Sequence, residues 1–246
     1  PNEPCNVAKF QEMAYACMDG IYKRGNLPII VGGTGFYIQS ILYGISFEQE
    51  EADSLREQIE AYYREQGEAN LWNRLEACDP VSAAAIHPNN VKRVIRAIEY
   101  YERTGTCISD HNAKEREKEP IYQGLYLVLT NERALLYETI NERVDQMVSM
   151  GLFQEVERLL KKGYTKDMTS MQAIGYKEII AYYEGNLTKD EAIDLIKQHT
   201  RHFAKRQMTW FRRERNVYMI DKSHYESEQE IVLAILDKWS KEYELL

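Results

Sequence analysis

A glycine-rich turn is the first segment of this sequence that could hold a ligand. It consists of Gly32, Gly33, Thr34 and Gly35 and follows a short apolar run. Glycines let backbone N–H groups approach a phosphate or a nucleobase, and the N-terminus of a following helix favours anions. A tight strand-to-helix turn with Thr34 as the N-cap explains the same residues equally well. The turn is not a Walker A loop, because it has no Gly-Lys-Ser/Thr sequence.

An arginine that could bind a phosphate lies in the helical pattern of residues 131–150. Arg143 stands beside an apolar stripe, at the edge of the face that the stripe is expected to bury. The members of the stripe recur every three or four residues and are Arg133, Tyr137, Ile140, Val144 and Met147. A partly buried arginine needs an anionic partner, and a guanidinium binds a diphosphate through paired hydrogen bonds. A structural salt bridge, for example with Glu142, is the alternative that this segment alone favours.

Residues 168–177 carry side chains that could contact a nucleobase. Gln172 could read a base edge and Tyr176 could stack on a base. If Ser170 caps a helix here, Gly175 falls within its first turns, where glycine is costly. Such a glycine indicates close approach of a ligand or another backbone, or else a helix that starts later.

A fourth candidate is the basic and aromatic segment at residues 197–215. Its seven basic residues stand against a single acid, Glu214. These residues are Lys197, Arg201, Lys205, Arg206, Arg212, Arg213 and Arg215. Cations and aromatic rings on one helix suit RNA backbone and stacked bases, whereas a solvated basic face over an aromatic core is the alternative. In a protein of net charge −8, charge this one-sided favours anion binding.

The composition is that of a globular protein without special chemistry. The 246 residues are 44% hydrophobic and 28% charged, which suits one large or two modest domains. No apolar run approaches the roughly 20 residues that span a bilayer. The cysteines are not spaced as zinc ligands, and we expect reduced thiols in a cytoplasmic protein. They are Cys5, Cys17, Cys78 and Cys107. No nucleophile with a nearby base indicates covalent catalysis.

The elements that must position these residues follow from periodicity. Residues 27–31, 126–130 and 217–220 are apolar runs typical of buried strands, and residues 7–24, 36–43, 131–150, 153–161, 173–183 and 189–215 have helical spacing. Between residues 53 and 103 the pattern is helical throughout, with Asn89 as the cap of a helix through residue 101. Residues 110–120 form a predicted charged linker. We expect an α/β core at residues 1–50 and 121–246, interrupted by a helical insertion at residues 51–120.

An ordered set of motifs resembles the tRNA dimethylallyltransferase family and covers nearly the whole chain. The matching segments are residues 31–38, 79–90, 93–99, 143–156, 172–178 and 205–212. The resemblance implies a helix-dominated, P-loop NTPase-like α/β core whose helical insertion grips the anticodon stem-loop of tRNA. It further implies that dimethylallyl diphosphate, assisted by Mg²⁺, prenylates the N6 amine of the adenosine 3′ to the anticodon. Such a transfer needs no enzyme nucleophile, only a stabilised leaving diphosphate, a positioned amine and a proton acceptor.

The same resemblance implies roles for individual residues. Thr34 and Arg143 would be catalytic, with Arg133 and Arg206 on the diphosphate side and Gly32, Gly33 and Gly35 forming the turn. The tRNA contacts would be Lys92, Arg93, Arg96, Ser170, Met171, Gln172, Ala173, Ile174, Gly175 and Tyr176. Thr34, Arg143 and residues 172–176 are expected to converge on one tunnel, with no bound metal ligated by the chain.

Two departures from the family pattern set further expectations. The P-loop and the aspartate-containing segment after it are not found in this chain, which begins at Pro1, and Thr139 stands where the family has a second arginine. We therefore expect an N-terminally truncated core that does not catalyse prenyl transfer alone. An adenylate isopentenyltransferase acting on free AMP or ATP and a non-catalytic RNA-binding fragment are the alternatives. We expect a monomer that does not associate with membranes.

Overall fold

The computed structural model describes residues 1–3, 5–47 and 54–243, and these form two compact units. The core unit comprises Pro1–Ile38 and Gln123–Leu246, and the helical unit comprises Gln39–Tyr122. Helix α2 (Gly35–Tyr43) runs across the first of these boundaries. The predicted domain boundary at residues 50 and 51 lies outside the described residues, so that division stays a prediction.

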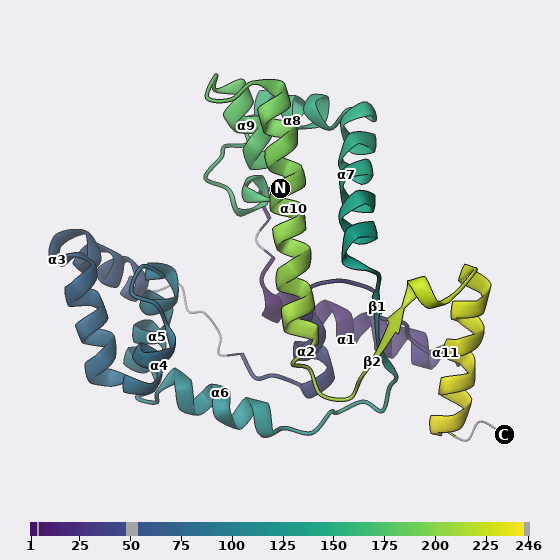
Figure 1. Cartoon of the computed structure of the whole chain (residues 1–246). Helices are drawn as coiled ribbons and strands as arrows, with labels where there is room; N and C mark the ends of the chain where they lie inside the picture. The colour runs from purple at the N-terminus through teal and green to yellow at the C-terminus, as the bar shows by residue number, and fades with distance from the viewer. Residues whose placement is uncertain (4, 48–53, 244–246) are drawn as a thin grey trace. The chain divides into compact units, whose positions relative to one another are not determined.

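A two-stranded parallel sheet lies in the core unit. Strand β1 (Tyr126–Thr130) pairs with β2 (Val217–Asp221) in a register that runs from Tyr126 opposite Val217 to Thr130 opposite Asp221 (Figure 1). Both strands were predicted, but they are less buried than expected. Val128 and Ile220 are buried, whereas Leu129 is 55% exposed.

The prediction of a strand at residues 27–31 is wrong. This segment is extended but belongs to no described strand, and Ile29 and Val31 are 82% and 89% exposed. An apolar run becomes a strand only where another strand supplies its hydrogen bonds. Neither β1 nor β2, the strands of the described residues, pairs with it.

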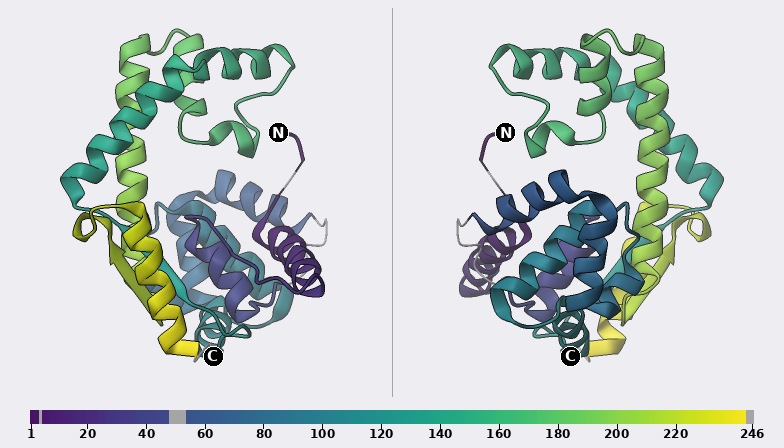
Figure 2. Two further views of the ribbon diagram at one scale, coloured as in Figure 1. Left: turned by 90° about the vertical axis from the view of Figure 1, so that its right-hand side faces the viewer. Right: turned by 90° about the vertical axis from the view of Figure 1, so that its left-hand side faces the viewer.

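The helices of the core unit carry the basic and glycine-containing segments. They are α1 (Val7–Lys23), α7 (Arg133–Ser149), α8 (Leu152–Lys161), α9 (Tyr176–Tyr183), α10 (Lys189–Phe211) and α11 (Glu228–Tyr243), with short 3₁₀ turns at Thr169–Gln172 and Lys222–His224. Helix α10 begins at a capping box, in which Thr188 and Glu191 satisfy each other's backbone N–H groups. It packs beside α7 and α9, as Figures 1 and 2 show. Their shared core includes Val144, Met171 and Ile196.

The helical unit consists of α3 (Leu55–Cys78), α4 (Pro80–Ala85), α5 (Val91–Thr104) and α6 (Ile108–Glu117). Gly67 interrupts α3 with a φ of 80°. Helix α6 covers most of residues 110–120, so the prediction of a linker there is wrong over most of its length. Helix α5 begins after Asn90 rather than after the predicted cap, Asn89.

A buried aspartate explains why α6 forms. The Asp79 carboxylate accepts hydrogen bonds from the backbone N–H and hydroxyl of both Ser82 and Ser109, at 2.6–3.0 Å. Burial alone would raise the pKa of Asp79, but these hydrogen bonds outweigh it and hold the pKa below its usual value. The carboxylate thus joins the first turns of α4 and α6, a contact across 30 residues that local charge does not reveal.

Candidate functional site

The glycine turn is held by the far end of α10. The Gln207 side-chain amide donates a hydrogen bond of 2.7 Å to the carbonyl oxygen of Gly33. The Thr34 carbonyl accepts from the backbone N–H groups of Tyr37 at 3.0 Å and Ile38 at 3.2 Å, so Thr34 starts α2 as the turn interpretation predicts. Its side chain is on the surface.

Side chains of α10 pack closely against two glycines of the turn, Gly33 and Gly35. A Cβ on Gly33 would lie 2.2 Å from Gln207 Nε2, and a Cβ on Gly35 would lie 2.2 Å from Trp210 Cδ1 and Nε1. Gly32 has no atom within 4 Å of such a Cβ. Side chains of α10 therefore occupy the Cβ side of Gly33 and Gly35, and the approach of a ligand to the backbone of the turn stays a prediction. Gly32 alone leaves its side of the backbone open.

A cavity of about 200 Å³ lies at the carboxyl ends of the two strands. Its lining residues come from both strand ends, α7 and α10, and are Leu129, Thr130, Asn131, Leu136, Thr139, Ala204, Gln207, Met208 and Lys222. We call it the sheet-edge cavity. Gln207 contributes to its wall and also holds Gly33, so the cavity and the glycine turn share one side chain.

The two candidate arginines of α7, the helix that contributes Leu136 and Thr139 to this cavity, differ in their contacts. Arg143 stands one helical turn beyond Thr139 on the same face of α7. Its side chain is exposed rather than partly buried, and among the described residues it has no hydrogen bond or ion pair, with Glu142 or otherwise. Arg133 instead donates to the Tyr137 hydroxyl at 3.1 Å, with its guanidinium 5.1 Å from that ring.

The segment expected to contact tRNA is built around Gly175. Helix α9 starts at Tyr176, and Gly175 is its N-cap with a φ of 98°, so the later helix start is confirmed. The buried Glu178 carboxylate accepts from the Gly175 N–H at 2.7 Å, and His199 Nδ1 lies 2.6 Å from its other oxygen. Met171 is fully buried in the core, which corrects its expected contact with tRNA.

Other side chains of this segment already have protein partners. The Tyr176 hydroxyl donates to the Glu155 carboxylate, which raises the pKa of Tyr176 to about 12. Gln172 donates to the Lys166 carbonyl, and Ser170 donates to the Pro1 carbonyl at 2.9 Å. Ala173 is exposed and Ile174 is half-buried against the core. Their tRNA contacts stay predictions.

The glycine turn and the Gly175 segment lie at different levels of α10. His199 contacts the Gly175 segment through Glu178, and Gln207 contacts Gly33 eight residues later, a rise of about 12 Å. Neither the sheet-edge cavity nor a larger open cavity of about 690 Å³ beside Asn141 and Arg201 is lined by Thr34, Arg143 or residues 172–176. The described residues therefore do not bring the three predicted segments into one of these cavities.

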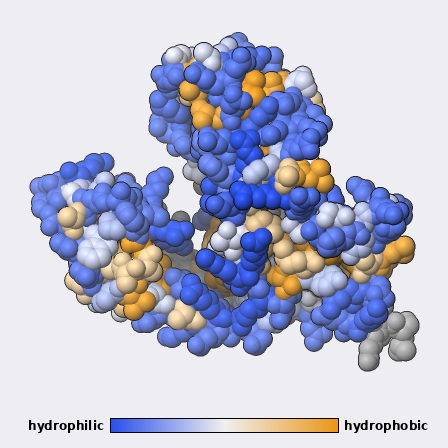
Figure 3. All heavy atoms as spheres, in the orientation of Figure 1, coloured by the Kyte–Doolittle hydropathy of each residue, from blue (hydrophilic) through white to orange (hydrophobic). Residues whose placement is uncertain are grey.

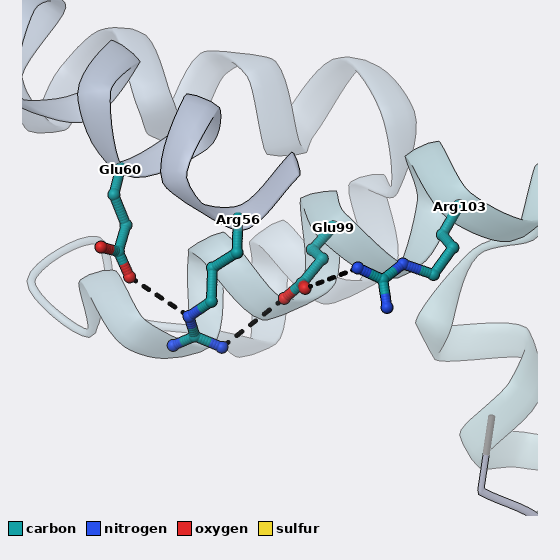
Figure 4. A network of polar contacts seen from close by, with 4 residues as sticks. All are labelled: Arg56, Glu60, Glu99 and Arg103. Atoms are coloured by element: carbon teal, nitrogen blue, oxygen red, sulfur yellow. Dashed lines mark hydrogen bonds and ion pairs between the residues drawn. The ribbon is translucent and has the colours of Figure 1, made fainter. Parts of the chain in front are cut away.

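Three cations of the helical unit stand free on α5. Lys92, Arg93 and Arg96 are exposed, opposite a buried stripe, and none has an ion pair among the described residues. We call them the α5 cations. Farther along, Glu99 binds Arg103 at 3.1 Å and Arg56 at 3.6 Å (Figure 4). The positive charge of α5 is thus uncompensated in its first turns only. The visible face of this unit, at the left of Figure 3, is mostly hydrophilic.

Some cations of α10 are also bound by other side chains, whereas Arg206 has no acidic partner among the described residues. Lys197 pairs with Asp145 at 2.7 Å, and Arg201 donates to Asn141 at 2.6 Å. Arg206 lies 5.7 Å from the Phe203 ring and stays exposed, without an acidic partner in the described part of the chain. Part of the basic segment therefore serves packing between α7 and α10, and part remains available to an anion.

Neither a membrane-spanning helix nor a cluster of metal ligands is found among the described residues. None of the described helices is both long and apolar enough to cross a bilayer. The described residues also contain no group of three or more His, Cys, Asp or Glu side chains that could hold a metal ion.

Comparison with known proteins gives consistent matches over almost the whole chain. Residues 1–214 match the family model described as IPP transferase. A protein named tRNA dimethylallyltransferase from Lachnoclostridium phytofermentans is 48% identical over 237 residues, which are 96% of this chain and 76% of the relative.

Two solved structures match as well. The tRNA isopentenylpyrophosphate transferase from Bacillus halodurans is 39% identical with a TM-score of 0.68, and the match covers 100% of this chain and 77% of that one. A eukaryotic dimethylallyltransferase acting on tRNA is 25% identical with a TM-score of 0.78, covering 98% and 63%. These likenesses confirm the predicted helix-dominated α/β fold class.

Proposed function

Because the chain belongs to the IPP transferase family, we propose that it transfers a dimethylallyl group from dimethylallyl diphosphate to the N6 amine of the adenosine 3′ to the anticodon in tRNA. The observation that carries this proposal is the 48% identity, over 96% of the chain, to a protein named tRNA dimethylallyltransferase. In the reaction, the amine nitrogen forms a bond to the allylic carbon while the carbon–oxygen bond breaks. Diphosphate leaves with the electron pair, and the amine loses a proton to an acceptor.

The donor side of this reaction needs positive charge near the leaving group. Arg143 suits that role because it is exposed, lacks an ion pair among the described residues, and lies one turn from the sheet-edge cavity. Arg206 and Arg133 are further candidates, although Arg133 is already held by Tyr137. Thr34 would act at the start of α2. Mg²⁺ keeps several waters and binds substrate phosphates, so we propose that it enters with the diphosphate rather than at a dedicated protein site.

The tRNA side of the proposal rests on the helical unit. The α5 cations are uncompensated and exposed, as binding to a phosphate backbone requires. A free mononucleotide offers no extended backbone for three such cations, which favours tRNA over AMP. We propose that the protein acts on tRNA in the cytoplasm and as a monomer.

A prenylation assay separates this proposal from its alternatives. The 246-residue chain is incubated with dimethylallyl diphosphate, Mg²⁺ and an anticodon stem-loop RNA, and modified adenosine is detected by mass spectrometry. Turnover supports the proposal and refutes the expectation that the chain is inactive alone. Modification of AMP in place of the stem-loop would make it an adenylate isopentenyltransferase.

Binding measurements complete the test. Stem-loop binding without turnover would support the RNA-binding alternative. Replacing the α5 cations with alanine should weaken stem-loop binding, whereas Lys161→Ala, which removes a surface lysine paired with Glu157, should not. Equal losses in both variants would contradict the assignment of tRNA to α5.

A further inference from the structure

The sheet-edge cavity contains a single charged side chain. Among its nine lining residues Lys222 is the one ion, and no acid contributes to the wall. Lys222 is exposed and has no ion pair or side-chain hydrogen bond within the described ranges. The acid beside it in the sequence, Asp221, does not line the cavity, and its Oδ1 accepts from the Ser223 backbone N–H at 3.0 Å and hydroxyl at 2.7 Å. Lys222 is therefore the one charge in the cavity wall and has no ion pair among the described residues.

The position of Lys222 suits a ligand contact. It directly follows the last residue of β2, and the same cavity is lined by Thr130, the last residue of β1, and by Asn131, which follows that strand. Ligands of parallel α/β sheets bind outside the carboxyl ends of the strands. Because Asp221 accepts from Ser223, the turn that carries Lys222 has a fixed backbone, and only its side chain needs to order.

The other lining residues limit what the ligand can be. Asn131 Oδ1 accepts from the Glu132 N–H at 3.0 Å, which leaves the Asn131 amide group as a second donor. Leu136 and Met208 supply apolar wall, and apolar surroundings strengthen the attraction between a cation and an anion. The volume of about 200 Å³ lies below the roughly 300–1,000 Å³ of sites for larger ligands. The cavity therefore fits a small anionic group better than a nucleoside.

From this arrangement we propose that Lys222 is a binding residue for the diphosphate group of the prenyl donor. The ligand's identity rests on the proposed function, whereas the anion site itself rests on the cavity. Arg143 lies one turn along α7 from Thr139, a residue of the cavity wall, so it is a second cation on an element that lines the cavity.

Calorimetric titration of the full chain with inorganic diphosphate tests the proposal. Lys222→Met should weaken binding about tenfold or more, the expected loss of one charge-assisted hydrogen bond. Lys222→Arg should retain most of the affinity, and Lys162→Met, at an exposed lysine after α8, should leave it unchanged. Circular dichroism spectra of all variants establish that each is folded.

The outcomes separate the two proposals. Equal diphosphate affinity in wild type and Lys222→Met, or no diphosphate binding by wild type, overturns the role of Lys222. A loss of stem-loop RNA binding in Lys222→Met also overturns it, because the anion would then be an RNA phosphate. If Lys222-dependent diphosphate binding is found but neither stem-loop RNA nor AMP is prenylated when the chain is assayed, the anion site stands and the proposed function fails.

Discussion

Substitution of the three glycines in the turn by alanine should separate steric from ligand-related roles. At Gly35 a Cβ would lie 2.2 Å from two atoms of the Trp210 indole, a rigid ring that cannot yield by rotating a terminal group. Overpacking of this kind costs about 1–3 kcal/mol. A gain of up to about 1 kcal/mol in helix propensity offsets part of it, because Gly35 starts α2. We expect Gly35→Ala to lower stability by about 1–2 kcal/mol.

The neighbouring positions provide matched controls. In Gly33→Ala the new methyl group would displace the movable end of the Gln207 side chain. We therefore expect the loss of its hydrogen bond to Gly33, which lowers the free energy of unfolding by about 0.5–1.5 kcal/mol. In Gly32→Ala the new methyl group has no atom within 4 Å, so the substitution should leave stability unchanged or raise it by about 0.4–1 kcal/mol.

Thermal unfolding followed by circular dichroism measures these differences. For a chain of this size each kcal/mol moves Tm by about 2–4 °C, so Gly35→Ala should unfold roughly 2–8 °C below wild type. Combining it with Trp210→Leu should cost less than the sum of the single changes, because the smaller side chain removes the clash. An unchanged Tm in Gly35→Ala, or a lower Tm in Gly32→Ala, would refute the assignment of this space to α10.

Three further changes test other contacts. Replacing each of the α5 cations should lower the slope of log affinity against log salt by about 1 for stem-loop RNA, measured by fluorescence anisotropy; an unchanged slope contradicts a phosphate contact. Glu178→Gln should cost about 1–3 kcal/mol in denaturant unfolding, because it removes the charge that faces His199, whereas Glu184→Gln at an exposed ion pair should cost under about 1 kcal/mol. Because the folded-state pKa of Tyr176 is raised to about 12, its bond to Glu155 contributes stability fully below pH 10 and loses it as the pH rises toward 12. Wild type should therefore lose more stability than Tyr176→Phe over that range, and parallel losses would count against the bond.

The sequence predicts those elements whose signals are local. β1 and β2 are short apolar runs closed by polar residues, and the helical periodicity of α7 and α10 marks both to within a few residues. The motifs also lead to the family. Residues 27–31 have the same apolar signal as a strand, but their state depends on a pairing partner, which composition does not specify.

Contacts between distant residues are what the sequence does not predict. Gln207 bonds to Gly33, which lies 174 residues away in the chain, and His199 contacts Glu178, which lies 21 residues away. In the sequence alone, a glycine that a protein side chain packs against cannot be distinguished from a glycine that leaves room for a ligand. Glu178 did leave one local signal, because an acid three residues after an N-cap suits a capping box. Lys222 left none, since a lone lysine after a strand is usually a solvated surface residue.

Helix α10 fixes the spacing between the two segments that the motifs associate with substrates. Each is joined to α10 through a side chain, Gln207 at the glycine turn and His199 with Glu178 at Gly175, and the two attachments stand about 12 Å apart along one rigid helix. A single nucleobase or a single diphosphate is too short to contact both segments at once. Two substrates that meet end to end beside α10 could do so, one at each segment. The spacing thus excludes one small ligand held by both segments at once, whereas an RNA loop, alone or with a second substrate, is long enough to span them.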